Sequence, residues 1–319
     1  MFQTKIDINP PSFKIKPDSR LLSIGSCFSE NIGKKLADIY FDIQINPTGI
    51  VFNPASVFKS VEMIIDGKLL TESDLFYRQN KWGSYLHSTQ FSDENSQICL
   101  DKINHKLTLA NRQLKTSNFL IITFGTAWVY KLKATNEIVS NCHKHPSGDF
   151  IRERLSAKQI VELAHKTLAK LEQFNPGLNI IFAVSPVRHI KDGATENNIS
   201  KGLLLQAVQE LTQTNANYYY FPSYEIQLDE LRDYRFYADD MLHPSTVAID
   251  YIFKRFKDNL FDKNTQEYSE LTTNYSNAIN HKAENTNTSE YEKFMEYTIK
   301  LRAQLAAKFP HLERHFAFG

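Results

Sequence analysis

The sequence predicts an α/β fold built on a mostly parallel, doubly wound sheet. Short apolar segments alternate along the chain with longer segments whose apolar residues recur at helical spacing. The short segments are apolar on both faces and partly β-branched, which is typical of strands that helices cover on both sides. With 319 residues the chain is long enough to bury such a core.

Five segments have the strand pattern and four have the helix pattern. The strand segments are residues 20–25, 41–46, 118–125, 178–186 and 217–223. The helix segments are residues 30–40, 94–115, 156–174 and 198–214. In the third helix segment, Ser156 is a suitable N-cap, and Ile160 and Leu168 lie on one apolar face.

Two regions depart from this alternation and define the expected domain organisation. Residues 66–93 mix aromatic and turn-forming residues, so we expect a large insertion within an α/β domain that spans residues 1–262. Residues 262–290 are polar and rich in Asn and Thr, which predicts a loosely structured connector. Apolar residues at helical intervals then predict an amphipathic helix that completes a 263–319 extension. This helix packs on the body or on a partner subunit, and the second arrangement would give a homo-oligomer.

Composition and charge argue against several classes of protein. The 37 Lys and Arg residues balance 36 Asp and Glu, whereas nucleic-acid-binding proteins usually have a basic excess. No apolar run reaches the ~18 residues of a membrane span, and the N-terminal segment lacks the apolar stretch of a signal peptide. Three cysteines far apart in sequence favour a reducing compartment over a disulfide framework. We therefore expect a cytoplasmic protein with neither a membrane span nor a nucleic-acid partner.

Two potential nucleophiles follow the first predicted strand. Gly25 ends the strand, and Ser26 and Cys27 come directly after it. Because ligands of open α/β sheets collect at the carboxyl ends of the strands, this turn is a candidate active site. The helix N-terminus and an imidazole would help the Cys27 thiol to ionise near neutral pH. The alternative is that Ser26 or Ser29 only caps the helix and Cys27 is a packing residue.

A carboxylate and an imidazole lie close together near the end of the α/β portion. His243 follows Asp240 by three residues, so the two can share one turn. Asp240, rather than Asp239, can then orient the ring while its other nitrogen faces a nucleophile, as in a catalytic triad. The alternative is a helix N-cap formed by Asp239, Asp240 or Ser245, with a surface histidine nearby.

These two motifs together resemble the SGNH/GDSL hydrolase superfamily, and within it the GSCFA family. The residues Gly25-Ser26-Cys27-Phe28-Ser29 match the motif that names the family, with Ser in place of the final Ala. Further similar stretches are 46–54, 125–130, 141–146, 184–193 and 232–245. The resemblance covers roughly residues 15–260 and implies a three-layer α/β/α sandwich, beyond which the C-terminal helical extension continues.

The same resemblance implies roles for individual residues. It places Cys27 at the position of the nucleophilic serine, with Ser26 in support, and Gly125 at the start of the block that normally supplies an oxyanion-hole Asn. Ala127 stands where that Asn is expected, and a missing donor could cost ~3 kcal/mol. Gly49 fits the glycine whose backbone N–H contributes to the hole. Candidate replacement donors are Asn53, Asn141 and the backbone N–H of Cys27 or Phe28.

Other polar residues suit substrate binding better than metal binding. The run from Asn141 to His145 contains Cys and His, but no further ligand pair completes a zinc site, so we expect no metal and no cofactor. We expect His143 and Lys144 to line the cleft instead. Arg188 and His189 follow a predicted strand at its carboxyl end, where Arg can bind a carboxylate or phosphate.

The sequence therefore predicts an acyl hydrolase or acyltransferase of the ester or thioester class. Cys27 or Ser26 would form a covalent acyl-enzyme, His243 would transfer the proton, and Asp240 would orient His243. The expected substrate is a small molecule or a carbohydrate or lipid precursor that carries an acyl group. The alternative is a non-catalytic binding module that kept the fold after losing the oxyanion-hole Asn.

Overall fold

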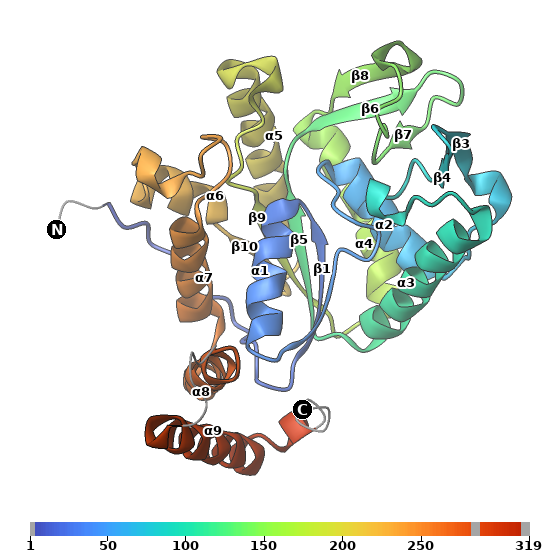
Figure 1. Cartoon of the computed structure of the whole chain (residues 1–319). Coiled ribbons are helices and arrows are strands. Elements are labelled where there is room, and N and C mark those ends of the chain that lie inside the picture. Colours follow the sequence, from blue (N-terminus) through green and yellow to red (C-terminus); the bar gives the residue numbers. More distant parts are fainter. Residues whose placement is uncertain (1–3, 282–287, 314–319) are drawn as a thin grey trace.

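A five-stranded parallel sheet forms the centre of the molecule. The computed structural model describes residues 4–281 and 288–313 (Figure 1). The strand order is β10-β9-β5-β1-β2, and every neighbouring pair is parallel. These strands are β1 Arg20–Gly25, β2 Asp42–Ile45, β5 Phe119–Phe124, β9 Asn179–Val184 and β10 Tyr218–Phe221. All five strands that the sequence predicts are therefore present.

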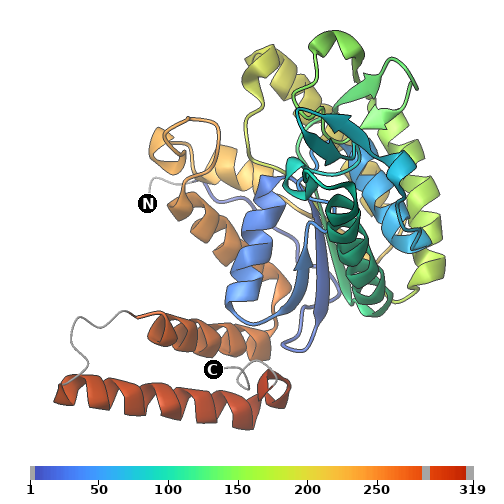
Figure 2. The same ribbon diagram turned by 45° about the vertical axis from the view of Figure 1, so that its right-hand side comes forward.

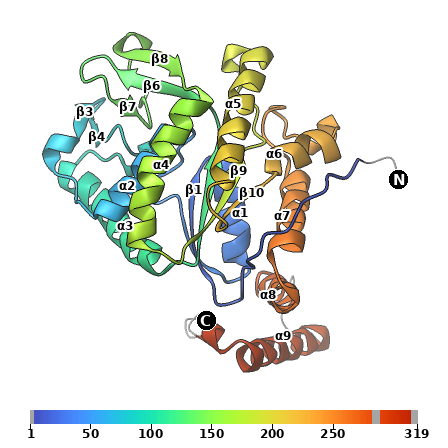
Figure 3. The same ribbon diagram turned by 180° about the vertical axis from the view of Figure 1, so that it is seen from behind.

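Helices cover both faces of this sheet, so the domain has the predicted three layers (Figures 1 and 3). Paired residues of β5 and β9 alternate between two apolar clusters: Ile121 and Ile181 contribute to one, and Ile122 and Phe182 to the other. On the first side lie α1 Cys27–Asp38 and α7 Thr246–Leu260. On the second lie α2 Pro54–Asp66, α3 Ser96–Thr116, α4 Ala157–Phe174 and α5 Ala194–Thr212.

Some elements differ from those predicted. Helix α1 begins at Cys27 rather than near residue 30, and α2 was not predicted. Asn53 caps α2, since its side chain accepts a hydrogen bond from the Ser56 N–H. Two small antiparallel sheets lie beside the main one: β3 Phe76–Arg78 with β4 Lys81–Gly83, and β6 Trp128–Leu132 with β7 Ile138–Val139 and β8 Phe150–Arg154. The first of them lies in the predicted 66–93 insertion.

The predicted loose connector is wrong over most of its described length. Residues Lys263–Ile279 form the helix α8, and α9 follows at Ser289–Lys308, close to the predicted C-terminal helix (Figure 2). Residues 282–287 of the predicted connector lie outside the described residues. The polar sequence of α8 is explained by Tyr268, which is fully buried and donates its hydroxyl hydrogen bond to the Tyr40 carbonyl. Burial of Tyr268 thus helps to hold α8 against the body although most residues of this helix are polar.

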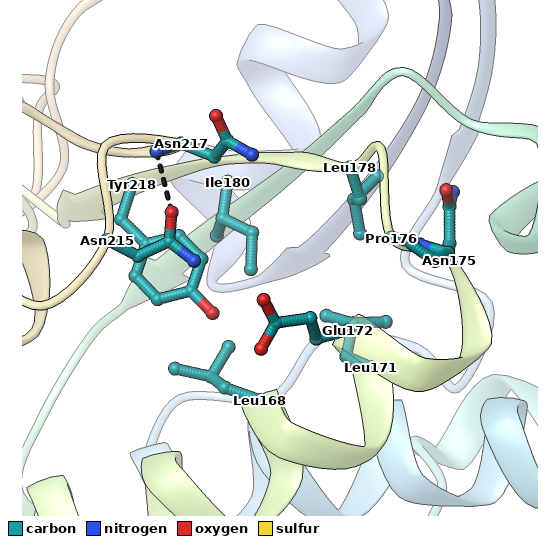
Figure 4. Close-up of a pocket in the computed structure, with 10 residues that line it drawn as sticks. All are labelled: Leu168, Leu171, Glu172, Asn175, Pro176, Leu178, Ile180, Asn215, Asn217 and Tyr218. Carbon is teal, nitrogen blue, oxygen red and sulfur yellow. Dashed lines mark hydrogen bonds between the residues drawn. The ribbon is translucent and has the colours of Figure 1, made fainter.

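The two C-terminal helices lie at the end of the sheet opposite the candidate site. Tyr40 follows the C-terminal end of α1, whereas Cys27 begins that helix, so α8 packs at the amino ends of the strands (Figure 1). A small cavity of ≈ 20 Å³ also lies at that end, between α4 and the starts of β9 and β10 (Figure 4). This volume accommodates about one water molecule, so the cavity is too small for an acyl substrate.

We expect the substitution Tyr268→Ala to destabilise the protein by about 3–5 kcal/mol, because it removes a fully buried aromatic ring and leaves a cavity. Chemical denaturation of the two proteins measures the difference. Tyr297→Ala on α9 is the matched control, since this ring is 50% exposed and its loss should change stability by no more than about 0.5 kcal/mol. Equal stability of both variants would contradict the packing of α8.

Candidate active site

The turn after β1 depends on Gly25. Its φ angle is +149°, and a Cβ atom there would lie 2.2 Å from the Thr123 carbonyl oxygen of β5. Only glycine adopts this conformation without strain and leaves room for the neighbouring strand. The Gly25 N–H donates to Asn46 Oδ1 at 2.9 Å, and its carbonyl accepts from Val51 at 3.0 Å. The turn is therefore held by the loop that follows β2.

Ser26 and Cys27 have different environments. Ser26 is fully buried, and its Oγ has no hydrogen-bond partner in the described part of the chain. It is the N-cap residue of α1, but its side chain makes no capping bond. Cys27, the first residue of α1, is partly exposed. Of the two potential nucleophiles, only Cys27 can contact a bound molecule without a rearrangement.

The Cys27 thiol is less acidic than expected. Burial raises its pKa above the ordinary value, and the carboxylate of Glu30 acts in the same direction. Hydrogen bonding from the backbone N–H groups of Phe28 and Cys27, together with the charge of Lys201, opposes this rise without cancelling it. Desolvation therefore outweighs the helix N-terminus, and the raised pKa contradicts the expected ionisation of Cys27 near neutral pH.

Asp240 contacts His243 as their spacing predicts. Asp240 Oδ2 lies 2.6 Å from Nδ1 of the ring, and its Oδ1 accepts from the backbone N–H groups of Leu242 and His243. These backbone bonds, and then the ring contact, lower the Asp240 pKa to about 2. Met241, at a φ of +57°, makes this tight turn possible. The N-cap of α7 is Ser245, whose side chain accepts a hydrogen bond from the Ala248 N–H. Asp240 therefore does not cap this helix, and its carboxylate contacts the His243 ring.

Residues that follow β9 connect this turn to Cys27. The Arg188 N–H donates to the Leu242 carbonyl at 3.0 Å, which places the His243 turn beside the end of β9. The pKa of the next residue, His189, is lowered to about 4, mainly by burial. The nearby charges of Lys201 and His243 act in the same direction. Lys201 in turn interacts electrostatically with Cys27. In this conformation no hydrogen bond joins the Cys27 thiol to the His243 ring.

Lys201 is a site residue that the sequence analysis missed. It is 1% exposed, and its ammonium group donates to the carbonyls of Gly125 and Ser185, each at 2.6 Å. These carbonyls follow the carboxyl ends of β5 and β9. The signal was its position on α5: Lys201 lies on the same helical face as Leu204, Val208 and Leu211, which are all buried. A lysine within an apolar stripe is rare, so the sequence pattern itself marks position 201 as unusual.

The proposed oxyanion donors are partly occupied. The Gly49 N–H donates to the Asn46 carbonyl at 2.8 Å, and the Gly125 N–H donates to the Phe52 carbonyl at 2.7 Å. Neither glycine N–H is therefore free in this conformation. The Asn53 Oδ1 caps α2, so only its Nδ2 could donate to a substrate. The backbone N–H groups at the start of α1, which face the Cys27 sulfur, are the donors best placed for an oxyanion.

The loop from Asn141 to His145 packs against the insertion. His143 Nε2 lies 2.9 Å from the Ser84 carbonyl and 3.1 Å from the His87 carbonyl. Asn141 Oδ1 accepts from the His143 N–H, while Lys144 is exposed. The insertion itself reaches the site wall, because the Ser88 N–H donates to the Thr48 carbonyl next to Gly49. The described hydrogen bonds of the His143 ring thus join this loop to the insertion.

Three further observations concern what surrounds this region. Residues 4–281 and 288–313 contain no group of three or more His, Cys, Asp or Glu side chains arranged to hold a metal ion. Among the same residues, no helix combines the length and apolarity that crossing a bilayer requires. A cavity of ≈ 820 Å³ lies between α2, α4 and the β6–β7 hairpin, but its lining does not include Cys27 or His243.

Acid should destabilise the protein partly through His87. This ring is fully buried, and burial followed by the charge of His143 lowers its pKa from 6.5 to about 4. Between these values the unfolded chain binds the proton and the folded chain does not, so stability falls as the pH drops from 6.5 to 4. We expect His87→Gln to remove up to about 3 kcal/mol of this acid-dependent loss.

Denaturation of the variant at pH 7 and at pH 4 measures that difference. His105→Gln, at an exposed position of α3, is the control and should leave the pH dependence unchanged. A His87→Gln protein that loses as much stability on acidification as the wild type would contradict the prediction.

A comparison with family models agrees with the family resemblance. The family model described as the GSCFA family matches residues 20–256. Among solved structures, one that is similar is the acetyl xylan esterase Est2A from the rumen bacterium Butyrivibrio proteoclasticus, with a TM-score of 0.41 and 12% sequence identity. That similarity covers 80% of this chain and 66% of the esterase chain. No curated protein matches the sequence. Because the family model spans most of its length, the chain belongs to the GSCFA family.

Proposed function

We propose that this protein is an acyl hydrolase or acyltransferase that acts on an ester or thioester through an acyl-enzyme on Cys27. The observation that carries the proposal is the arrangement at the carboxyl edge of the sheet. A partly exposed cysteine begins α1 there, and an imidazole held at 2.6 Å by Asp240 belongs to a turn bonded to the end of β9. Nucleophile, base and orienting carboxylate are the parts that acyl transfer requires.

In the proposed reaction, His243 takes the Cys27 proton as the sulfur attacks the acyl carbonyl. A C–S bond forms, and the carbonyl electron pair moves onto oxygen, where the first N–H groups of α1 stabilise the negative charge. When the tetrahedral intermediate collapses, His243 returns the proton to the departing alcohol or thiol. Water or a second alcohol then attacks the acyl-enzyme, with His243 again accepting the proton. The C–S bond breaks as this second intermediate collapses, the acyl product leaves, and His243 returns the proton to the Cys27 sulfur. The raised pKa of Cys27 makes this base necessary.

Roles for the remaining residues belong to the same proposal. Arg188 makes no ion pair with a carboxylate in the described part of the chain, so it is available for an anionic group of the substrate. His189 follows it in the chain, and we assign the exposed Lys144 to the same substrate-binding role. The Asn53 Nδ2 could join the oxyanion donors directly, and the Gly49 N–H could do so if substrate displaced its bond to the Asn46 carbonyl. A reducing compartment such as the cytoplasm would keep Cys27 active.

An acyl probe distinguishes the two nucleophiles. We expect an activated acyl ester to label Cys27, as mapped by mass spectrometry, and Cys27→Ala to abolish both labelling and turnover. Ser26→Ala should keep turnover, since the buried Ser26 side chain does not reach the substrate. Circular dichroism confirms that both variants fold. If Cys27→Ala retained activity while Ser26→Ala lost it, Ser26 would be the nucleophile.

The same probe tests the alternative, a binding module without catalysis. For an enzyme, labelling of Cys27 is fast and disappears in His243→Ala. Labelling no faster than that of a free thiol, and unaffected by His243→Ala, would reject acyl transfer. Activated esters of graded chain length, assayed together with acyl thioesters, would then define the substrate class of an active protein.

The two neighbouring carboxylates provide a matched pair. We expect Asp240→Asn to lower kcat by about 10²–10⁴-fold, because the ring loses the acceptor that fixes its orientation and stabilises its charge. Asp239→Asn should leave kcat within about twofold, since Asp240 makes the hydrogen bond to the ring. Steady-state kinetics at several pH values measure both. A larger loss in Asp239→Asn would contradict the assignment.

A further inference from the structure

Lys201 is a buried cation without an acidic partner. No carboxylate forms an ion pair with it within residues 4–281 and 288–313, and its described bonds go to the Gly125 and Ser185 carbonyls. The face of the Tyr224 ring lies 5.6 Å from the ammonium. Hydrogen bonds to neutral carbonyls satisfy two of its three N–H donors, but they provide no full opposite charge. Burial of an unpaired ammonium normally costs free energy, so a lysine here needs an explanation.

The charges around Lys201 identify one possible counter-ion. Arg188 and His189 are cationic or neutral, and Tyr224 is neutral at ordinary pH because burial raises its pKa further. Glu30 faces Cys27 rather than Lys201 and is paired with Lys34 on the surface of α1. The hydrogen bonds place Lys201 near Cys27: its ammonium bonds to the Gly125 carbonyl, and the Ser26 N–H, next to Cys27, donates to the carbonyl of Thr123, two residues before Gly125, at 3.2 Å. In the described part of the chain, the acidic group whose charge acts on Lys201 is Cys27, as the thiolate.

We propose that Lys201 is a positioning residue that stabilises the Cys27 thiolate from beneath the site, while it holds together the ends of β5 and β9. The inference rests on the proposed function, since it assigns Lys201 to the ionisation of its nucleophile. The step itself is a proton transfer: the S–H bond breaks, the proton moves to His243 or to solvent, and the electron pair stays on sulfur. No other reactant is needed.

The charge of Lys201 itself depends on pH, and this gives the proposal a distinctive signature. Burial, and then the charge of Arg188, lowers the Lys201 pKa to about 7. Below that pH the ammonium is present and favours the thiolate, whereas well above it the wild-type amine is neutral, as a variant without a charge is at every pH. A charge-removing substitution should therefore reduce the thiolate population at acidic and neutral pH only.

Alkylation of Cys27 by iodoacetamide in the full chain tests this, because the reagent reacts with the thiolate and requires no acyl substrate. Rates are measured from pH 5.5 to 10 by mass spectrometry of the Cys27 peptide. Cys142, whose charged neighbour is Lys191, serves as the internal reference. The variants are Lys201→Gln, which keeps a donor for the two carbonyls without the charge, and Lys201→Arg, which keeps the charge. If Lys201→Gln does not fold, Lys201→Met replaces it.

We expect Lys201→Gln to slow Cys27 alkylation about tenfold at pH 6 and to match the wild-type rate at pH 10. Lys201→Arg should match wild type at pH 6 and, because its guanidinium keeps the charge, react at least as fast as wild type at pH 10. Cys142 should react equally in all proteins. A folded neutral variant whose rates equal those of wild type, or are lowered equally at every pH, would overturn the proposal.

The two proposals can fail separately. Turnover of acyl esters without the pH-dependent difference would reject the role of Lys201 and retain acyl transfer. The pH-dependent difference without turnover on any acyl ester or thioester would reject acyl transfer and retain the electrostatic coupling.

Discussion

The close approach of Gly25 to the Thr123 carbonyl is the constraint on which the candidate site depends. Because no side chain separates β1 from β5 at this point, the chain can turn directly from the end of the sheet into α1. The turn brings Cys27 to the first position of that helix and buries Ser26 beneath it. The bonds from Asn46 and to Val51 then fix the turn, and with it the position of the sulfur.

Burial decides the electrostatics of this region. It raises the pKa of Cys27, and it lowers that of His189 to about 4 and that of Lys201 to about 7. Burial thus favours the neutral form of each of these three groups. Asp240 is the opposite case, since it is exposed and bonded to two backbone N–H groups, which favours its charged form. In the candidate site, Asp240 therefore keeps its negative charge, whereas burial favours the neutral forms of Cys27, His189 and Lys201.

The sequence predicted the sheet well because its three central strands, β1, β5 and β9, are almost fully buried and nearly continuous in apolar residues. It also predicted the contact between Asp240 and His243, which is local and set by three residues of spacing. It failed where distant parts of the chain determine the structure. Helix α8 depends on Tyr268 reaching Tyr40, and the Cys27 pKa depends on desolvation by surrounding residues. Lys201 was missed for the same reason, since its carbonyl partners lie 76 and 16 residues away.

A thiol with a raised pKa also has a consequence for chemical durability. Peroxide oxidises the thiolate form of cysteine, and the protonated thiol reacts slowly. Cys27 is partly exposed, so its protection from oxidation comes from protonation of the thiol rather than from inaccessibility. Desolvation of the sulfur thereby lowers its nucleophilicity and at the same time slows its oxidation.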